Sequence, residues 1–279
     1  MKRILNSKKL QKFELYLRNE EKSEATLQKY MRDVRRFASY AGLDGISKET
    51  VLEYKARLAE RYTPTSANSM IAAINAFFRF CGWHELCIKQ FKIQREAYCS
   101  AEKELTREEY IRLVNAAKDG NNERLSLIIQ TICSTGIRVS ELQYVTVDAL
   151  HAGEAFVRCK GKNRRIFIIP ELKKKLLRYV KEQRISSGAV FVTRSGRPIS
   201  RINIWREMKA LCEEAGVAPT KVFPHNLRHL FARTFYGIEK DIAKLADILG
   251  HASINTTRIY IVTTGEEHRR KLEHMRLII

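Results

Sequence analysis

The C-terminal half of the sequence holds four polar residues whose types and spacing suit chemistry on a phosphodiester. His225 and Arg228 are three residues apart within Pro224–His229. That spacing places both on one face of a helix, near the positive end that favours an anion. His251 follows a helix-ending glycine, and Tyr260 comes nine residues later. Such a set could bind a phosphate and attack it with a phenol oxygen.

A second group of candidates lies upstream. Arg138 follows the glycine break of Thr135–Ile137, at the point where a helix restarts. Glu141, three residues on, could hold the Arg138 guanidinium in a bidentate pair. Lys160 lies at the turn between two predicted strands, from which its long side chain could reach into a groove. Each element is a weak indication alone, but their order and spacing together are a strong one.

Cleavage of a phosphodiester without a metal needs several groups at once. Arginine donors must stabilise the negative charge that builds on the nonbridging oxygens. A base must assist the nucleophile, and an acid must protonate the leaving 5′ oxygen. A covalent route also needs an oxygen nucleophile. The C-terminal third of the chain supplies such a set.

Other routes to phosphate chemistry lack their motifs here. The sequence has no Gly-x-x-x-x-Gly-Lys-Ser/Thr loop, no His-Glu-x-x-His pair and no dense acidic cluster for two metal ions. His225 and His229 could share a helix face, but Arg228 beside them would repel a metal cation. We therefore expect no metal, no nucleotide cofactor and no small-molecule substrate.

Taken together, the ordered set resembles the tyrosine recombinase (phage integrase) family. The matching segments are Thr135-Gly136-Ile137-Arg138-Val139-Ser140-Glu141-Leu142, Lys160-Gly161, His225-x-x-Arg228-His229, Leu249-Gly250-His251 and Tyr260. The layout is nearest to Xer-type recombinases and to transposon or phage integrases of similar length. By position and pattern alone, the N-terminal helices resemble the SAM-like core-binding domain of that family.

The resemblance implies a role for each candidate. Arg138 and Arg228 would bind the scissile phosphate and stabilise its pentavalent state, and His251 would hydrogen-bond it. His225 would assist proton transfer at the nucleophile. Lys160 would act as the general acid on the 5′ leaving oxygen.

The resemblance also implies the reaction and the assembly. Tyr260 would attack the phosphorus, giving a 3′-phosphotyrosine and a free 5′ hydroxyl, and the 5′ hydroxyl of a partner strand would reverse the step. The substrate would be double-stranded DNA with an inverted-repeat site. Four protomers, monomeric when free, would exchange strands sequentially through a Holliday junction. The predicted function is site-specific recombination for integration, excision or resolution of DNA elements.

Two assignments stay open. Lys160 aligns with the active lysine of the family, but Lys162 lies nearer the tip of the turn and remains an alternative general acid. The tail over residues 262–279 could form a final helix whose apolar end docks on its own protomer or on a neighbour. We interpret His229 as structural and give Glu141 a supporting role at most.

Two rival functions share parts of this pattern. A type IB topoisomerase-like enzyme would relax DNA with the same chemistry and no sequence preference. A non-catalytic DNA-binding protein, such as a repressor, could keep the same scaffold. The small helical front domain and the Xer-like spacing argue against the first, and the complete set of candidate groups argues against the second.

The composition favours a DNA partner. The 279 residues carry a formal net charge of +20, and each phosphate contact by Lys or Arg releases counterions. Hydrophobic residues make up 44% of the chain, enough to bury a sizeable core. No apolar run approaches the roughly 18 residues that span a bilayer, and the N-terminus has no secretory signal. We therefore expect no membrane partner and a cytoplasmic location.

The elements that must position the candidates divide into two units. Residues 1–87 predict a bundle of four short helices, residues 88–104 a charged linker, and residues 105–279 a catalytic domain. In that domain helices are expected over 107–118, 122–134, from Ser140, 170–184, 200–215, 225–236 and 240–249, and strands over 155–159, 165–169 and 189–193. The expected fold is mainly α, with a small antiparallel β-sheet in the C-terminal domain.

Overall fold

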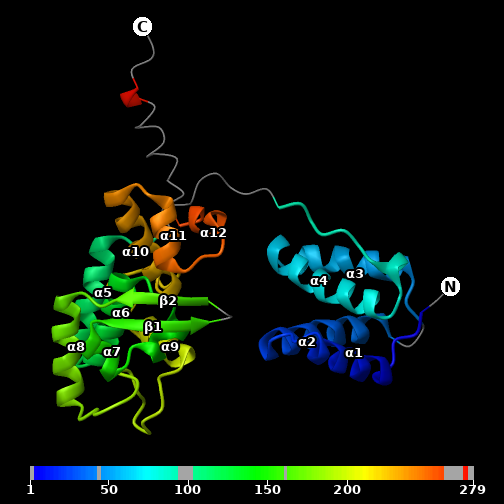
Figure 1. The fold of residues 1–279 in the computed structure, drawn as a ribbon. Coiled ribbons are helices and arrows are strands. Elements are labelled where there is room, and N and C mark those ends of the chain that lie inside the picture. Colours follow the sequence, from blue (N-terminus) through cyan, green and yellow to red (C-terminus); the bar gives the residue numbers. More distant parts are fainter. Residues whose placement is uncertain (1–2, 43–44, 94–102, 160–161, 261–272, 276–279) are drawn as a thin grey trace. The chain divides into compact units, whose positions relative to one another are not determined.

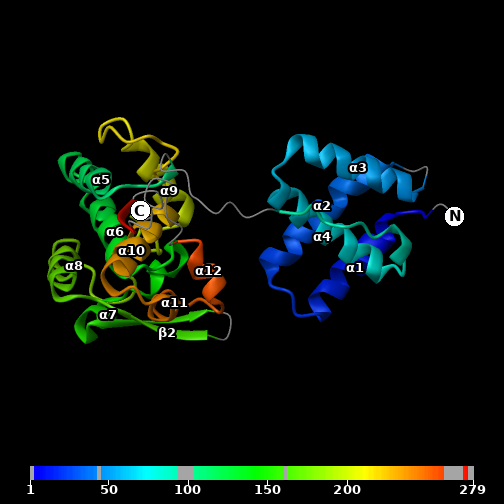
Figure 2. The ribbon, with the colours of Figure 1, turned by 90° about the horizontal axis from the view of Figure 1, so that it is seen from above.

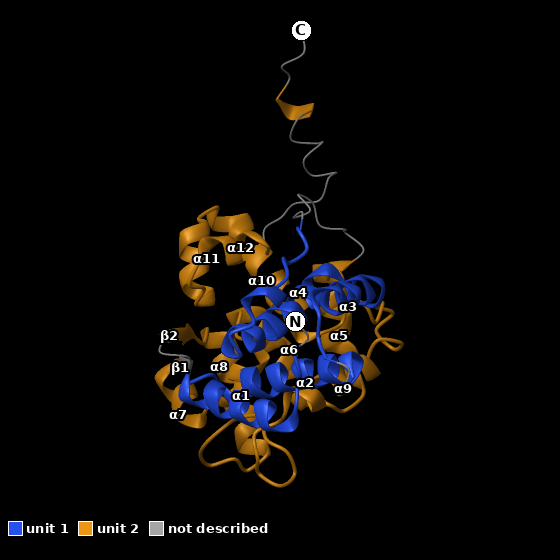
Figure 3. Ribbon diagram, turned by 90° about the vertical axis from the view of Figure 1, so that its right-hand side faces the viewer, with its two compact units in different colours: residues 1–95 blue, residues 96–279 orange. Residues whose placement is uncertain are grey.

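The computed structural model describes residues 3–42, 45–93, 103–159, 162–260 and 273–275. The chain divides into two compact units, residues 1–95 and 96–279, which Figure 3 shows in two colours. Each unit has its own hydrophobic core.

The first unit is a bundle of helices that starts at polar caps. Its helices are α1 (Ser7–Asn19), α2 (Glu24–Ala41), α3 (Lys48–Arg61), α4 (Pro64–Phe80) and the short η1 (His84–Leu86). The side chains of Ser23, Ser47 and Thr63 accept hydrogen bonds at the starts of α2, α3 and α4, as their positions in the sequence predict. Figure 1 shows these helices side by side, and aromatic side chains of α1, α2 and α4 fill the space between them.

The structure describes the two ends of the segment expected as a linker, residues 88–93 and 103–104. Ile88 is buried in the core of the first unit, and the Asn75 side chain both accepts from its N–H and donates to its carbonyl oxygen. Asn68 holds the backbone of Phe91 in the same way. At the other end, the carbonyl oxygen of Lys103 accepts a hydrogen bond from Asn226 of the second unit. Amide side chains therefore bind the backbone at Ile88, Phe91 and Lys103, contacts that local periodicity does not reveal.

The second unit is mainly helical. Its helices are α5 (Arg107–Asp119), α6 (Glu123–Thr135), the 3₁₀ helix η3 (Val139–Tyr144), α7 (Val147–Ala152), α8 (Pro170–Glu182), α9 (Arg201–Ala210), α10 (Pro224–Glu239), α11 (Ile242–Leu249) and α12 (Ile254–Arg258). The capping box of Thr106 and Glu109 that opens α5 is present as predicted. The single helix expected from Ser140 is instead two pieces, because Thr146 caps α7 as a separate helix.

A two-stranded antiparallel sheet lies beside these helices. Strand β1 (Glu154–Cys159) pairs with β2 (Lys162–Phe167) so that Ala155 faces Ile166 and Val157 faces Arg164. The second strand was expected over 165–169. It begins and ends earlier because Ile169 already serves as the N-cap of α8, with Pro170 in its first turn.

The strand expected over residues 189–193 is absent from this sheet. Among the described residues, Ala189 and Val192 make only isolated bridges, to Thr146 and Pro198. The apolar residues Val190 and Phe191 are buried, which explains the strand-like pattern. The predicted class, mainly α with one small antiparallel sheet, is nevertheless confirmed.

The expectation of a final helix in the tail falls mostly outside the described residues, which include only 273–275 of that segment. Within the part of the chain that the structure describes, each helix is too short or too polar to cross a lipid bilayer.

Candidate active site

Arg138 lies where α6 ends and the chain turns. Gly136 takes a left-handed conformation at the end of α6, with φ +63°, and a Cβ atom there would lie 2.5 Å from the ring of Phe231. Two residues later the backbone of Arg138 is extended, and η3 begins. The Arg138 side chain is 39% exposed, so part of its guanidinium faces solvent.

Glu141 anchors Arg138 and binds a second arginine. Its carboxylate accepts from Nη1 of Arg138 at 2.9 Å with one oxygen, and from the Arg138 backbone N–H at 2.9 Å with the other. The second oxygen also accepts from Arg164 on β2. The expected bidentate pair with one guanidinium is therefore wrong, because Glu141 is shared between two. Burial alone would raise the Glu141 pKa, but the N–H of Arg138 and the charge of Arg164 bring the pKa below its usual value.

Helix α10 places His225 in its first turn, after Pro224, and Arg228 at the start of its second turn. Arg228 is only 1% exposed. Its guanidinium donates to the carbonyl oxygen of Gly136, and to that of Leu249 at 2.7 Å. Burial, followed by the nearby Arg138 charge, lowers the Arg228 pKa to about 10, so the group stays cationic at neutral pH.

His251 leaves the end of α11, where Gly250 has φ +63°. Its Nε2 lies 2.9 Å from Nη2 of Arg228, and its Nδ1 lies 2.8 Å from Oγ1 of Thr257 on α12. Because a guanidinium can only donate, Nε2 must accept, and the proton must sit on Nδ1. Burial, then the Arg228 charge, lowers the His251 pKa to about 4, so the imidazole is neutral at pH 7.

Tyr260 follows α12 and turns its phenol into the same site. It is 6% exposed, and its hydroxyl lies 3.4 Å from Nε2 of His225. Its ring lies 4.3 Å from the His229 ring and 5.3 Å from the His251 ring, between centroids. The Arg228 guanidinium lies 6.0 Å from the same ring. The phenol is therefore enclosed by imidazoles and one buried cation.

The two histidines of α10 both have lowered pKa values, although by surface area His225 is exposed and His229 is half-buried. Burial lowers the His225 pKa, and the charges of Arg228 and Arg138 lower it further. Burial also lowers the His229 pKa to about 4, and its ring lies 4.8 Å from the His225 ring. Figures 1 and 2 show α10 and α11 packed together with α12 beside them, the arrangement that brings these side chains to one place.

Five of the six sequence-predicted residues therefore gather in one site: Arg138, His225, Arg228, His251 and Tyr260. Lys160 lies outside the described residues. Lys162 is the first residue of β2, and its side chain is not described. The structure therefore leaves the choice between these two lysines where the sequence left it. Among the described residues, no three metal-ligating side chains cluster.

Comparison with known proteins places this arrangement in a family. Residues 103–267 match the phage integrase family, and residues 10–85 match the phage integrase N-terminal SAM-like domain. The chain belongs to the phage integrase family. The tyrosine recombinase XerD of Halalkalibacterium halodurans is 32% identical over 276 residues, covering 90% of this chain and 91% of the relative.

Solved structures of phage integrase family members share this fold. The crystal structure of XerA recombinase is 28% identical and covers 98% of this chain and 99% of its own, with a TM-score of 0.55. A lambda integrase tetramer bound to a Holliday junction gives a TM-score of 0.72 at 18% identity, covering 91% of this chain and 76% of its own. At that identity the second likeness concerns the fold alone.

The sequence pattern did not indicate two residues that contact this integrase site. Arg164 reaches Glu141 from β2, and Thr257 reaches His251 from α12. Strand parity could have indicated Arg164, because it alternates with exposed residues and shares the inward face with buried Ile166. No local signal indicates Thr257, since a threonine in a short helix is ordinary.

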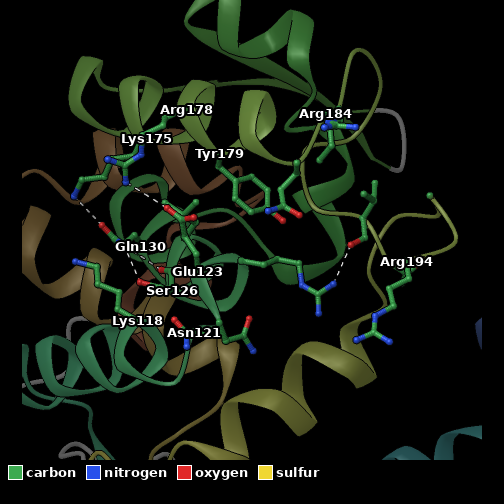
Figure 4. A pocket seen from close by; sticks show the side chains of 18 of the residues that line it. Lys118, Asn121, Glu123, Ser126, Gln130, Lys175, Arg178, Tyr179, Arg184 and Arg194 are labelled. Carbon is green, nitrogen blue, oxygen red and sulfur yellow. Dashed lines mark hydrogen bonds and ion pairs between the residues drawn. The ribbon is translucent and has the colours of Figure 1, made fainter.

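A cleft of about 1010 Å³ adjoins the site and is lined by Arg138, Glu141, Arg164 and His251, with Phe167 and Phe231 among its apolar residues. A second cleft, of about 1160 Å³, lies at the N-terminal end of α6 and contains none of the predicted site residues. Figure 4 shows Lys118, Arg178, Arg184 and Arg194 around it. Of the two clefts, the first adjoins the candidate site, because Arg138 and His251 are among its lining residues.

Proposed function

We propose that this chain is a site-specific DNA recombinase that cuts and rejoins strands through a 3′-phosphotyrosine on Tyr260. One observation carries the proposal. The Tyr260 hydroxyl lies 3.4 Å from a neutral imidazole, that of His225, in the site where Arg228 is buried and Arg138 is half exposed. A nucleophile, its base and two fixed cations are the groups that metal-free phosphoryl transfer requires besides an acid for the leaving oxygen.

Arg138 and Arg228 hold the scissile phosphate in this proposal. Arg228 is fixed by the two carbonyl oxygens that it binds, so its charge is preorganised. Arg138 is fixed through Nη1, and the rest of its guanidinium points toward solvent and the incoming phosphate. As the phosphorus becomes pentavalent, the two guanidinium groups neutralise the charge that grows on its nonbridging oxygens.

His225 and His251 accept and donate protons in this mechanism. Because its pKa is lowered, His225 is free at neutral pH to accept the phenol proton as Tyr260 attacks. His251 has its proton on Nδ1, directed at Thr257. To donate Nε2–H to the phosphate it must gain a second proton, and the negative charge of bound DNA favours that gain. We propose that His251 stabilises the phosphate in this way.

The step conserves the energy of the broken bond. The Tyr260 oxygen forms a bond to phosphorus, and the bond to the 5′ oxygen breaks. Lys160 supplies the proton to that oxygen in our proposal, with Lys162 as the alternative. Attack by the 5′ hydroxyl of a partner strand then restores the phosphodiester and releases the phenol, so the cycle needs no external energy source.

Helix α9 offers a surface that suits duplex DNA. Its outward face carries Arg201, Ile202, Trp205 and Arg206, of which Ile202 is 59% and Trp205 50% exposed. Arginines can pair with base edges or phosphates, and apolar groups can contact thymine methyl groups. We propose that this face contacts the core site, and that the SAM-like unit (residues 1–87 in the sequence analysis) contacts the same duplex.

The assembly is proposed by analogy with relatives. A lambda integrase tetramer binds a Holliday junction, and we propose that four copies of this chain act on two duplexes with inverted-repeat sites. We place the reaction in the cytoplasm, where the DNA of bacteria and archaea lies.

The test begins with selection of a binding site from randomised duplexes. A nicked duplex carrying that site, incubated with the wild-type protein, should trap a denaturation-resistant protein–DNA adduct, and Tyr260→Phe should trap none. An adduct that persists in Tyr260→Phe would remove Tyr260 as the nucleophile. Relaxation of supercoiled plasmids that lack the site, at the rate seen with the site, would favour the topoisomerase-like alternative.

A further inference from the structure

Arg164 is a buried cation whose contacts lie within the site, yet it does not face the phenol. It comes from β2, where it pairs across the sheet with Val157, and its side chain is 10% exposed. One end of its guanidinium binds Glu141, and Nη1 donates to the carbonyl oxygen of Ile248 at 2.5 Å. Burying the Arg164 guanidinium costs desolvation free energy, which its hydrogen bonds must offset.

The first consequence concerns the charge on Arg138. Glu141 is 3% exposed and binds both arginines. If Glu141 paired with Arg138 alone, the pair would be electrically neutral, and the attraction of Arg138 for a phosphate would be largely cancelled. With Arg164 on the same carboxylate the trio carries one net positive charge. In effect Arg164 neutralises Glu141, while Glu141 still fixes the position of Arg138.

The second consequence concerns the turn that carries His251. The last carbonyl oxygens of α11 would point at the site without partners. That of Ile248 accepts from Arg164 and that of Leu249 from Arg228. The stem of Arg164 also packs on Gly250, where a Cβ atom would lie 2.5 Å from its Cδ. Arg164 therefore ties the end of α11 to the segment that carries Arg138.

We propose that Arg164 is a positioning residue for strand cleavage, which keeps Arg138 both fixed and positively charged and holds the turn of His251 beside it. The inference rests on the proposed function, since it concerns charge delivered to a scissile phosphate. It assigns a role to a residue that touches neither the phenol nor the two imidazoles nearest the phenol in this site.

A single and a double variant test whether Arg164 acts by neutralising Glu141. Arg164→Met keeps most of the stem but leaves Glu141 to neutralise Arg138, so adduct formation on the nicked duplex should slow by roughly 10- to 100-fold. Adding Glu141→Gln to that variant removes the unbalanced carboxylate. The double variant should therefore form adduct about tenfold faster than Arg164→Met alone. A residue that only supported the fold would not be rescued by loss of its partner.

A neutral phosphate analogue gives a second readout. A methylphosphonate at the scissile position removes the charge that Arg138 must attract, so the defect of Arg164→Met should shrink to a few-fold on that substrate. If Arg164→Met does not fold, as judged by thermal unfolding, Arg164→Lys replaces it. Lysine keeps the charge but cannot span Glu141 and Ile248, and we expect about a fivefold loss on phosphate and none on methylphosphonate.

Three outcomes would overturn the inference: an unchanged rate in Arg164→Met or Arg164→Lys, no rescue by Glu141→Gln, or an equal defect on both substrates. The wild-type protein separates this inference from the proposed function. If the wild type forms no Tyr260 adduct, the proposed function fails. If the wild type forms one and the variants behave in any of these three ways, only the role of Arg164 fails.

Discussion

The Nη2 atom of Arg228 lies 2.9 Å from Nε2 of His251, with both groups held by further hydrogen bonds. The contact fixes which ring nitrogen carries the proton, because the guanidinium cannot accept. It also joins the start of α10 to the exit of α11, which together carry three of the candidate residues: His225, Arg228 and His251.

Thr257→Val should test whether the tautomer of His251 matters. Thr257 is fully buried and accepts from Nδ1 of His251, and valine has nearly the same shape without the hydroxyl. We expect adduct formation to slow by about tenfold, a typical effect of removing a group that orients an imidazole. Single-turnover cleavage of the nicked duplex measures it. Thr257→Ser keeps the hydroxyl and is the matched control, and equal rates in both variants would contradict the assignment.

Stability should depend on pH because two half-buried imidazoles are neutral in the folded protein. The pKa values of His229 and His251 are lowered to about 4 from an ordinary 6.5. The unfolded chain therefore binds more protons than the folded chain between these values, and the folded state loses stability as the pH falls from 6.5 toward 4. After allowance for solvent screening, the loss should total about 2 kcal/mol.

Urea denaturation across this pH range measures the effect. His229→Gln removes one of the two groups and should flatten the dependence by about half. A midpoint that is constant from pH 6.5 to pH 4 would show that these histidines titrate in the folded protein as in the unfolded chain, and a midpoint that rises toward acid would show that folding raises their pKa values.

Cleavage should also weaken in acid, for a different reason. His225 must be neutral to accept the Tyr260 proton, and its lowered pKa keeps it neutral at pH 7. The single-turnover rate should therefore stay level above pH 7 and fall below pH 6.5, as His225 gains a proton. A rate that increases as the pH falls through this range would argue that a protonated imidazole, that of His225 or of His251, acts in the limiting step.

Gly250→Ala should be far more damaging than an alanine at another left-handed glycine. At Gly250 a Cβ would lie 2.5 Å from Arg164, whereas at Gly153, with φ +79°, nothing lies within 4 Å. Both substitutions carry the backbone strain, about 1 kcal/mol, but only Gly250→Ala displaces Arg164. We expect a loss of about 2–3 kcal/mol of unfolding free energy and of most cleavage activity in Gly250→Ala. Comparable losses in Gly153→Ala would assign the effect to strain alone.

The identity of the general acid can be settled with a modified substrate. A sulfur in place of the 5′ leaving oxygen departs without a proton, so it bypasses the acid. Of Lys160→Ala and Lys162→Ala, the variant that lost the acid should be slow on the normal duplex and close to wild type on the sulfur duplex. We expect Lys160→Ala to behave in this way. Selective rescue of Lys162→Ala would reverse the assignment.

Much of the site could be predicted because short-range signals mark its turns. Gly136 and Gly250 mark the ends of α6 and α11 in the sequence, and Pro224 marks the start of α10. The residues just beyond those points are the candidates themselves. The membership of one family then follows from their order, which is a property of the sequence alone.

The partners that fix these candidates could not be predicted in the same way. Arg164 meets Glu141 only because β2 begins at Lys162 rather than at Arg165, a register that depends on the turn and on Ile169 capping α8. The contacts of Ile88 could not be predicted either, since Asn75, which binds its backbone, lies 13 residues away in the chain. Long-range hydrogen bonds of this kind do not appear as a periodic pattern in the sequence.

The burial of Arg228 affects how the free energy of DNA binding is used. Removing a guanidinium from water costs free energy. For Arg228 this cost is met during folding, because the carbonyl oxygens of Gly136 and Leu249 replace water as hydrogen-bond acceptors. An arriving phosphate therefore meets a cation with little water left to displace. In the proposed mechanism, less of the free energy of DNA binding is therefore spent on removing water from the site.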